Sequence, residues 1–159
     1  MTAMLSYEIL RFLHVFGATV LLGTGAGIAF FMVVSHQSRN AALIAHVAGI
    51  VVLADMVFTA TAAFFQPITG YLLMREVGYG LSDTWVWLSL GLYIFVGMFW
   101  LPVVWIQLQM RNLARTAASS GASLPQRYFR LYRIWFACGF PAFFAVLAIL
   151  WLMLTRPAF

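Results

Sequence analysis

One acidic residue inside an apolar segment has the clearest chemical meaning in this sequence. Asp55 lies about 20 Å along a hydrophobic segment that begins at Ala41. A carboxylate in membrane hydrocarbon is costly unless it is paired or protonated, so it is a functional candidate by default. One helical face of this otherwise apolar segment is polar or small, and it carries Asp55, Thr59, Ala62, Gln66 and Gly70. We predict that this stripe faces a bundle interior or a cavity.

A second pair of chemical groups lies in the first apolar segment. Arg11 and His14 are three residues apart and therefore share a helical face. Because successive membrane helices run antiparallel, His14 should reach a depth similar to that of Asp55 and Gln66. We therefore predict a buried cofactor-binding cluster of Arg11, His14, Asp55 and Gln66, with His14 as the metal ligand. The alternatives are a proton or ion path, or a buried Asp55 that only neutralises a cationic neighbour and sets helix register.

The other histidines and the methionines fit structural roles better. His46 precedes Asp55 by nine residues, about half a helical turn out of phase, so it should face away from the stripe at the membrane interface. His36 belongs to the same side of the membrane as His46. His14 and His46 therefore cannot clamp one haem, which argues against a bis-histidine cytochrome b. Methionines along apolar helices usually fill space, and we interpret three of them in this way: Met56, Met98 and Met110.

The elements that position these groups are transmembrane helices. The chain is 64% hydrophobic and 8% charged, whereas a soluble domain carries roughly 25% charged residues. Its apolar residues form four blocks, each long enough to cross about 30 Å of hydrocarbon. We predict one all-α domain over residues 1–159, an integral membrane antiparallel four-helix bundle with spans at about 7–35, 41–74, 85–110 and 131–154.

Several local features predict how these spans begin, bend and end. Pro67 lacks a backbone donor, so we expect a kink there that bends or tilts residues 68–74. Pro102 and Pro141 are candidates for similar kinks. Ser82 or Asp83 is expected to cap the third span with a side-chain oxygen. Arg156 and Pro157 should end the fourth span, and residues 111–130 should form the longest connection.

Arginine counts predict the orientation of the bundle. The first and third connections with their flanks carry six arginines, and the opposite side carries three: Arg39, Arg111, Arg115, Arg127, Arg130 and Arg133 against Arg11, Arg75 and Arg156. The richer side is expected in the cytoplasm, which places both termini outside. Tryptophans near span ends are expected at the headgroup level: Trp85, Trp87, Trp105, Trp135 and Trp151.

Small residues in the first span bear on helix packing and on partners. Gly23 and Gly27 form a small-xxx-small pair, which allows close approach of helices. We expect this pair to pack inside the bundle, with homodimerisation or a membrane protein partner as the alternative. Nucleic acid is excluded as a partner because no basic face could follow a phosphate backbone. The lipid bilayer is the partner that the composition requires.

The order of several motifs resembles a bacterial family of predicted integral membrane proteins of unknown function (domain of unknown function, family 2269). The motifs are LHVFGATVLLGTGAG in the first span, QPITGYLL closing the second, WLP in the third, and RLYRIWFACGFPAFFAVLAILWLMLTRP at the end. The resemblance implies a multi-pass protein of the bacterial inner membrane. That family is distantly similar to HemJ-type protoporphyrinogen oxidases and CopD-type copper proteins. In HemJ-type proteins a first-span histidine is linked to haem b, and His14 takes the matching place.

The resemblance has departures that limit what it implies. HemJ-type proteins carry a lysine in the third span, whereas this chain has no lysine, and their arginine after the first-span glycines is also missing. Protoporphyrinogen oxidation is therefore not transferred. No hydrolase, kinase or soluble-cofactor dehydrogenase motif is present either. Three functions remain open: haem-binding or redox association through His14, a non-enzymatic accessory or scaffold subunit, and a small transporter or proton-conducting element built on Asp55.

Overall fold

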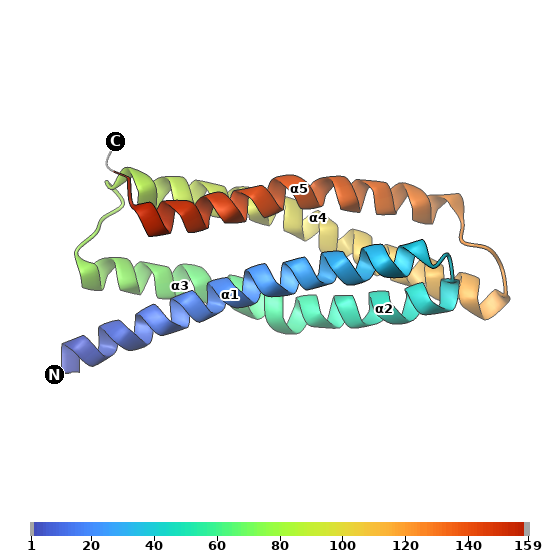
Figure 1. The fold of residues 1–159 in the computed structure, drawn as a ribbon, viewed down its shortest axis with the longest axis horizontal. Coiled ribbons are helices and arrows are strands. Elements are labelled where there is room, and N and C mark those ends of the chain that lie inside the picture. The colour runs from blue at the N-terminus through green and yellow to red at the C-terminus, as the bar shows by residue number, and fades with distance from the viewer. Residues whose placement is uncertain (1, 158–159) are drawn as a thin grey trace.

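Four long helical segments make up the protein. The computed structural model describes residues 2–157, and over that range the regular elements are all helical. In chain order they are α1 (Thr2–Gln37), α2 (Ala41–Ala54), the π-helical turn η1 (Asp55–Thr59), α3 (Ala60–Val77), α4 (Thr84–Ser120) and α5 (Gln126–Thr155). Because α2, η1 and α3 follow one another without a break, they form one span. The described residues thus contain 4 segments long and apolar enough to cross a membrane, as predicted (Figure 1).

The second span departs from regular α geometry at Asp55 and not at Pro67. Helical structure continues through Pro67 to Val77. At η1 the Ala60 N–H donates to the Asp55 carbonyl, five residues earlier, which is the hydrogen bond of a π-helix. The helix is therefore not interrupted at Pro67, and the kink expected there stays a prediction. The irregular turn instead coincides with the intramembrane carboxylate, and π-turns inside α-helices are frequent at functional sites.

A tyrosine from another helix explains why the chain tolerates Pro67. A proline lacks the N–H that would bond the carbonyl four residues earlier, which is here that of Ala63. The Tyr93 hydroxyl of α4 donates to that carbonyl. The side chain thus replaces the missing backbone donor and joins α3 to α4 within the membrane, where no water can satisfy the carbonyl.

The third span is longer than predicted, and its N-terminus is capped differently. α4 continues to Ser120, so residues 111–120 are helical and only residues 121–125 connect it to α5. Ala114 and Ala117 are buried there, which stabilises the extra turns. Gly121 ends the helix at φ 64°, a left-handed conformation that glycine adopts without strain. The Asp83 carboxylate makes no capping bond to α4 and accepts from Gly80 N–H at 2.7 Å instead.

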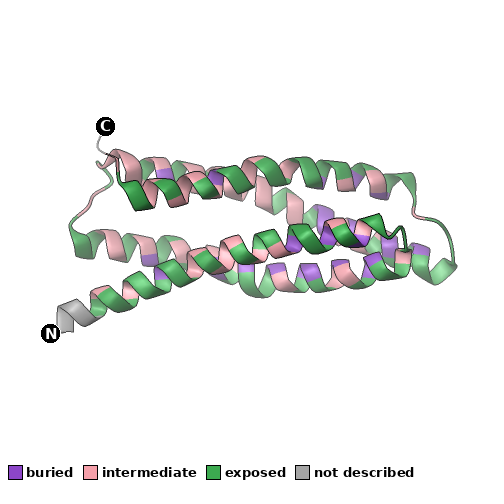
Figure 2. Ribbon diagram, viewed as in Figure 1, coloured by how far each residue is buried: buried purple, intermediate pink, exposed green. Residues whose placement is uncertain are grey.

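The hydrophobic core lies in one half of the bundle. α4 packs against α5 and α2, and α1 packs against α2 and α3. Figure 2 shows buried residues concentrated towards the end where α1 meets α2. The fully buried apolar side chains there include Met32, Ile44 and Met110. Trp135 is only 6% exposed and belongs to this core, so its indole packs inside the protein and does not face lipid headgroups.

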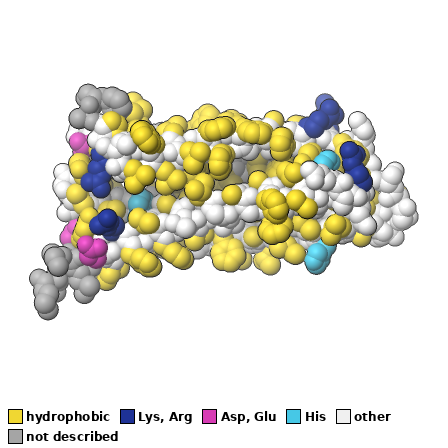
Figure 3. Space-filling view, in the orientation of Figure 1, with side chains coloured by type: hydrophobic (Ala, Val, Ile, Leu, Met, Phe, Trp, Pro, Cys, Tyr) yellow, Lys and Arg dark blue, Asp and Glu magenta, His cyan; other side chains and the backbone are white. Residues whose placement is uncertain are grey.

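Both termini lie at the same end of the bundle (Figure 1). We call this the terminal end, and the opposite end, which holds the α1–α2 and α4–α5 connections, the arginine-rich end. Figure 3 shows acidic side chains at the terminal end and none at the other end of the face in view. The helix order places the six arginines of the first and third connections and their flanks at the arginine-rich end, and the orientation of that end toward the cytoplasm stays a prediction.

The glycine pair of the first span does not pack within the protein. A Cβ built at Gly23 or Gly27 would meet nothing within 4 Å, so the prediction that this pair packs inside the bundle is wrong. Gly17 is the α1 glycine in close contact, because a Cβ there would collide with Gln66 Oε1 of α3. Close helix approach in α1 therefore occurs one to two turns nearer the terminal end than expected.

Candidate functional site

Asp55 is buried in the middle of its span and accepts hydrogen bonds from α4. The residue is 3% exposed. Trp100 Nε1 donates to Oδ1 at 3.2 Å. With the Gln107 amide oriented so that both its groups are paired, Gln107 Nε2 donates to Oδ2 at 2.8 Å. Trp100 and Gln107 are seven residues apart on α4, two helical turns, and so share a face toward the carboxylate.

The hydrogen-bond network continues from Gln107 to the last helix. In the same orientation, Gln107 Oε1 accepts from Trp135 Nε1 at 3.2 Å. Gln107 is 1% exposed, so the network is closed to solvent on that side. Side-chain hydrogen bonds that begin at the Asp55 carboxylate therefore connect three of the four spans. We call Asp55, Trp100, Gln107 and Trp135 the aspartate network.

The groups around Asp55 are neutral. Among the described residues Asp55 forms no ion pair, and its donors from α4 are an indole and an amide. Thr59, one turn further along the same face, has a buried hydroxyl beside the Asp55 carboxyl, and it forms no hydrogen bond to any other described residue. A carboxylate in this setting can bind a proton or small cation, because no arginine or histidine neutralises it.

His14 of α1 makes a second polar contact, with side chains of α3. Its Nδ1 lies 3.0 Å from Thr69 Oγ1. The Thr69 hydroxyl also lies within hydrogen-bond distance of the Phe65 and Gln66 carbonyls. When it donates to one of these carbonyls, the tautomer of His14 that fits has its proton on Nδ1 and donates it to Thr69. Gln66 Nε2 donates to the His14 carbonyl at 3.1 Å. Nε2 of His14 makes no hydrogen bond to any described residue.

The structure divides the predicted cluster in two. His14 and Gln66 lie together, as expected, and Gly70 packs on the imidazole so closely that a Cβ there would lie 2.9 Å from His14 Cε1. Asp55 precedes Gln66 by eleven residues, about 16 Å along the helix, and belongs to the aspartate network instead. Arg11 is exposed and contacts neither group. The single cluster is therefore corrected, because Asp55 and His14 lie at different depths along the bundle.

The polar stripe of the second span is buried as predicted. Asp55, Thr59 and Ala62 are each at most 9% exposed, and Thr69 continues the stripe at 8%. Sequence reasoning missed Thr69, although it lies three residues after Gln66. It also missed Trp100 and Gln107, whose seven-residue spacing was the available signal.

The two histidines at the arginine-rich end have different surroundings. His46 is exposed, in agreement with the interfacial position predicted for it. The His36 ring stacks on the Tyr132 ring at 3.5 Å between centroids, and His36 Nδ1 lies 3.2 Å from the Tyr128 hydroxyl. His36 therefore ties the end of α1 to α5, and neither histidine approaches Asp55.

Comparison with protein families agrees with this architecture. The family model described as "Predicted integral membrane protein (DUF2269)" matches residues 8–157. The chain belongs to this family. In this member, the match covers all four spans, the aspartate network and the His14 contact. No curated protein and no solved structure gives a match. The more distant resemblance to HemJ-type and CopD-type proteins lies outside this result and stays a prediction.

Proposed function

We propose that this membrane protein binds and releases a proton at Asp55, as part of a small transporter or proton-conducting element. The observation that carries the proposal is a buried carboxylate in mid-span, on a π-helical turn, with neutral partners only. A purely structural aspartate would be expected to neutralise a buried cation. Asp55 has no such neighbour among the described residues.

The surroundings can satisfy both protonation states of Asp55. The ionised carboxylate accepts from Trp100 and Gln107. When protonated, the carboxyl gains a donor, and the oxygen of the neighbouring Thr59 hydroxyl offers a candidate acceptor. Exchange between the two states therefore requires rearrangement of a few side chains and no separation of helices.

The distribution of polar groups favours access from the terminal end. From Asp55 toward that end this face carries the buried Thr59 and Thr69 and the half-buried Gln66. Toward the arginine-rich end, the apolar core contains Val51, Met32 and Met110, among other residues. Protons would thus reach Asp55 along the polar stripe, and passage to the other side would require the core to repack. The π-turn supports this step, because its extra residue can shift the register of the helix.

Proton flux into liposomes tests the proposal. Purified protein is reconstituted with a pH-sensitive dye inside the vesicles, and a potassium-valinomycin potential drives protons. We expect flux above that of empty vesicles, and its loss in Asp55→Asn. Glu76→Gln is the matched control, because it removes an exposed carboxyl at the end of the same span and should leave flux unchanged. Flux that is absent in the wild type, or equal in Asp55→Asn, would overturn the proposal.

Carbodiimide labelling provides an independent measurement. Dicyclohexylcarbodiimide enters membranes and reacts with protonated carboxyl groups. We expect mass spectrometry to locate the adduct on Asp55, with faster labelling at low external pH. Labelling confined to Glu8, Glu76 or Asp83 would contradict an exchangeable proton at Asp55.

Haem b bound through His14 is a second candidate. The observation that favours it is the orientation of the imidazole, since donation from Nδ1 to Thr69 leaves Nε2 as a free ligand atom. Arg11, one turn earlier, would then face a propionate, and haem would supply electron transfer. The candidate ranks second because His14 is 8% exposed and its ring packs on Gly70. Binding of a porphyrin therefore requires α1 to move away from α3.

An absorption spectrum of the purified protein tests haem binding. The expected result is a Soret band that is lost in His14→Ala. A colourless protein that takes up no added haemin contradicts the haem candidate.

An accessory or scaffold role is the third candidate, and it includes a homodimer. The Gly23 and Gly27 positions are open on the surface of α1, which leaves a close-packing helix face without a partner inside the protein. Cross-linking in native membranes distinguishes a dimer or larger complex from a monomer.

A further inference from the structure

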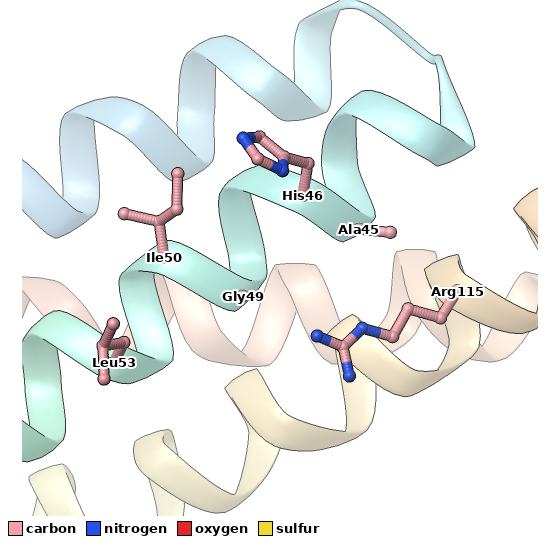
Figure 4. Close-up of a pocket in the computed structure, with 6 residues that line it drawn as sticks. All are labelled: Ala45, His46, Gly49, Ile50, Leu53 and Arg115. Atoms are coloured by element: carbon pink, nitrogen blue, oxygen red, sulfur yellow. The ribbon is translucent and has the colours of Figure 1, made fainter.

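A groove at the arginine-rich end combines a cation with an apolar floor. Its volume is about 370 Å³, and six residues line it: Ala45, His46, Gly49, Ile50, Leu53 and Arg115. Five of these come from α2 and Arg115 comes from α4. Figure 4 shows Arg115 reaching from α4 toward the turn of α2 that contains Gly49. The groove is therefore bounded by two helices of different spans.

Gly49 lies against the side chain of Arg115. A Cβ built at Gly49 would lie 3.4 Å from Arg115 Nη2, so the guanidinium lies directly over the glycine. Ile50 and Leu53 are 55% and 63% exposed, so the groove continues along α2 as an apolar surface. Arginine side chains in membranes usually extend toward water. Here the exposed guanidinium lies beside an apolar helix face, where an anionic group could pair with it.

No described residue of the protein supplies that partner. The chain has four acidic residues: Glu8, Glu76 and Asp83 lie toward the terminal end, and Asp55 is bonded within the aspartate network. Arg111 bonds Asn112, and Arg39 lies over the Phe129 ring. Among the described residues, Arg115 has neither an ion pair nor a hydrogen bond. An anionic partner of Arg115 would therefore come from outside the chain.

We propose that this groove binds one anionic phospholipid of the leaflet at the arginine-rich end. The guanidinium would pair with the lipid phosphate at two points, a geometry to which arginine is suited. An acyl chain would lie over Gly49 and along Ile50 and Leu53. The occupant is a lipid and not free phosphate, because most of the lining is apolar and faces the bilayer. An anionic headgroup is preferred over a zwitterionic one, because no carboxylate at this end could pair with a choline or ethanolamine.

Native mass spectrometry of detergent-purified protein tests the site. Dioleoyl phosphatidylglycerol and dioleoyl phosphatidylcholine are titrated separately, and inorganic phosphate is the third probe. We expect one tightly bound phosphatidylglycerol, with phosphatidylcholine weaker by about five- to tenfold, the effect of one cation near a charged headgroup. Arg115→Gln should remove most of this preference. Gly49→Leu should weaken phosphatidylglycerol binding while keeping every charge, because it fills the groove floor.

Two controls separate a site from general attraction to a basic surface. Arg130→Gln removes the same charge from an exposed position of α5 at the same end and should change binding less than twofold. Gly25→Leu adds the same side chain to α1, where nothing lies within 4 Å, and should have no effect. Equal losses in Arg130→Gln and Arg115→Gln, unchanged binding in Gly49→Leu, or displacement of the lipid by inorganic phosphate would each overturn the proposal. Circular dichroism confirms that each variant keeps its helices.

Discussion

The bond between Tyr93 and the carbonyl of Ala63 leads to a prediction that isolates one interaction. Tyr93→Phe removes only a hydroxyl and keeps the ring, so the packing of α4 on α3 is preserved. The Ala63 carbonyl then has no donor, because the residue four positions later is Pro67. Leaving a buried acceptor unpaired, within a membrane where water is absent, should cost about 1–2 kcal/mol of the free energy of unfolding.

A double-mutant cycle with Pro67→Ala makes this prediction sharper. An alanine at this position would restore the backbone N–H, which can then bond the Ala63 carbonyl in the ordinary helical way. Tyr93→Phe should therefore cost markedly less in the Pro67→Ala background, with a coupling of about 1 kcal/mol. The measurement is equilibrium unfolding in mixed micelles of dodecyl sulfate, followed by tryptophan fluorescence. Costs that add within about 0.5 kcal/mol would refute the idea that the tyrosine replaces the donor missing at Pro67.

Two further predictions concern packing and hydrogen bonding in the same assay. Gly70→Ala should destabilise the protein by about 1–3 kcal/mol, because its Cβ would lie 2.9 Å from His14 Cε1. The control Gly25→Ala should cost nothing, and equal effects of the two variants would contradict the close contact of α1 with α3. Gln107→Leu should lower the free energy of unfolding by about 2–3 kcal/mol, because it leaves Asp55 Oδ2 and Trp135 Nε1 without their partner. An unchanged free energy of unfolding would argue against the orientation in which the Gln107 amide pairs with both groups.

The position of each polar residue along its helix could be predicted from the sequence, but the partners of these residues could not. The face that carries Asp55, Thr59 and Ala62 is buried as its periodicity indicated. The place of His14 beside Gln66 also follows from antiparallel helices of known length. The neighbours predicted for Asp55 are nevertheless wrong. Asp55 lies about 16 Å along the span from Gln66, which contacts His14, so the prediction that Asp55 and His14 share one depth was wrong by about three helical turns.

The missing partners were hidden for a physical reason. In a soluble helix, alternation of polar and apolar residues marks the face that packs inward. In a membrane both lipid and protein neighbours are apolar, so the buried and exposed faces of α4 have similar composition. Trp100 and Trp135 therefore resembled interfacial tryptophans or lipid-facing side chains. Burial of Trp135 in the core, and the bond from Trp100 to Asp55, depend on contacts between α4, α5 and the second span.

Residue order alone is enough to predict four spans, their approximate ends, and a bundle with both termini on one side. These properties are local, because hydrocarbon requires about twenty apolar residues whose backbone groups bond within the same helix. The packing of the helices was needed to place the irregular turn at Asp55 and not at Pro67. The same is true of the separation of His14 from Asp55 and of the position of Arg115 over Gly49. Each of these depends on a side chain supplied by a neighbouring helix, and no spacing along a single span contains that information.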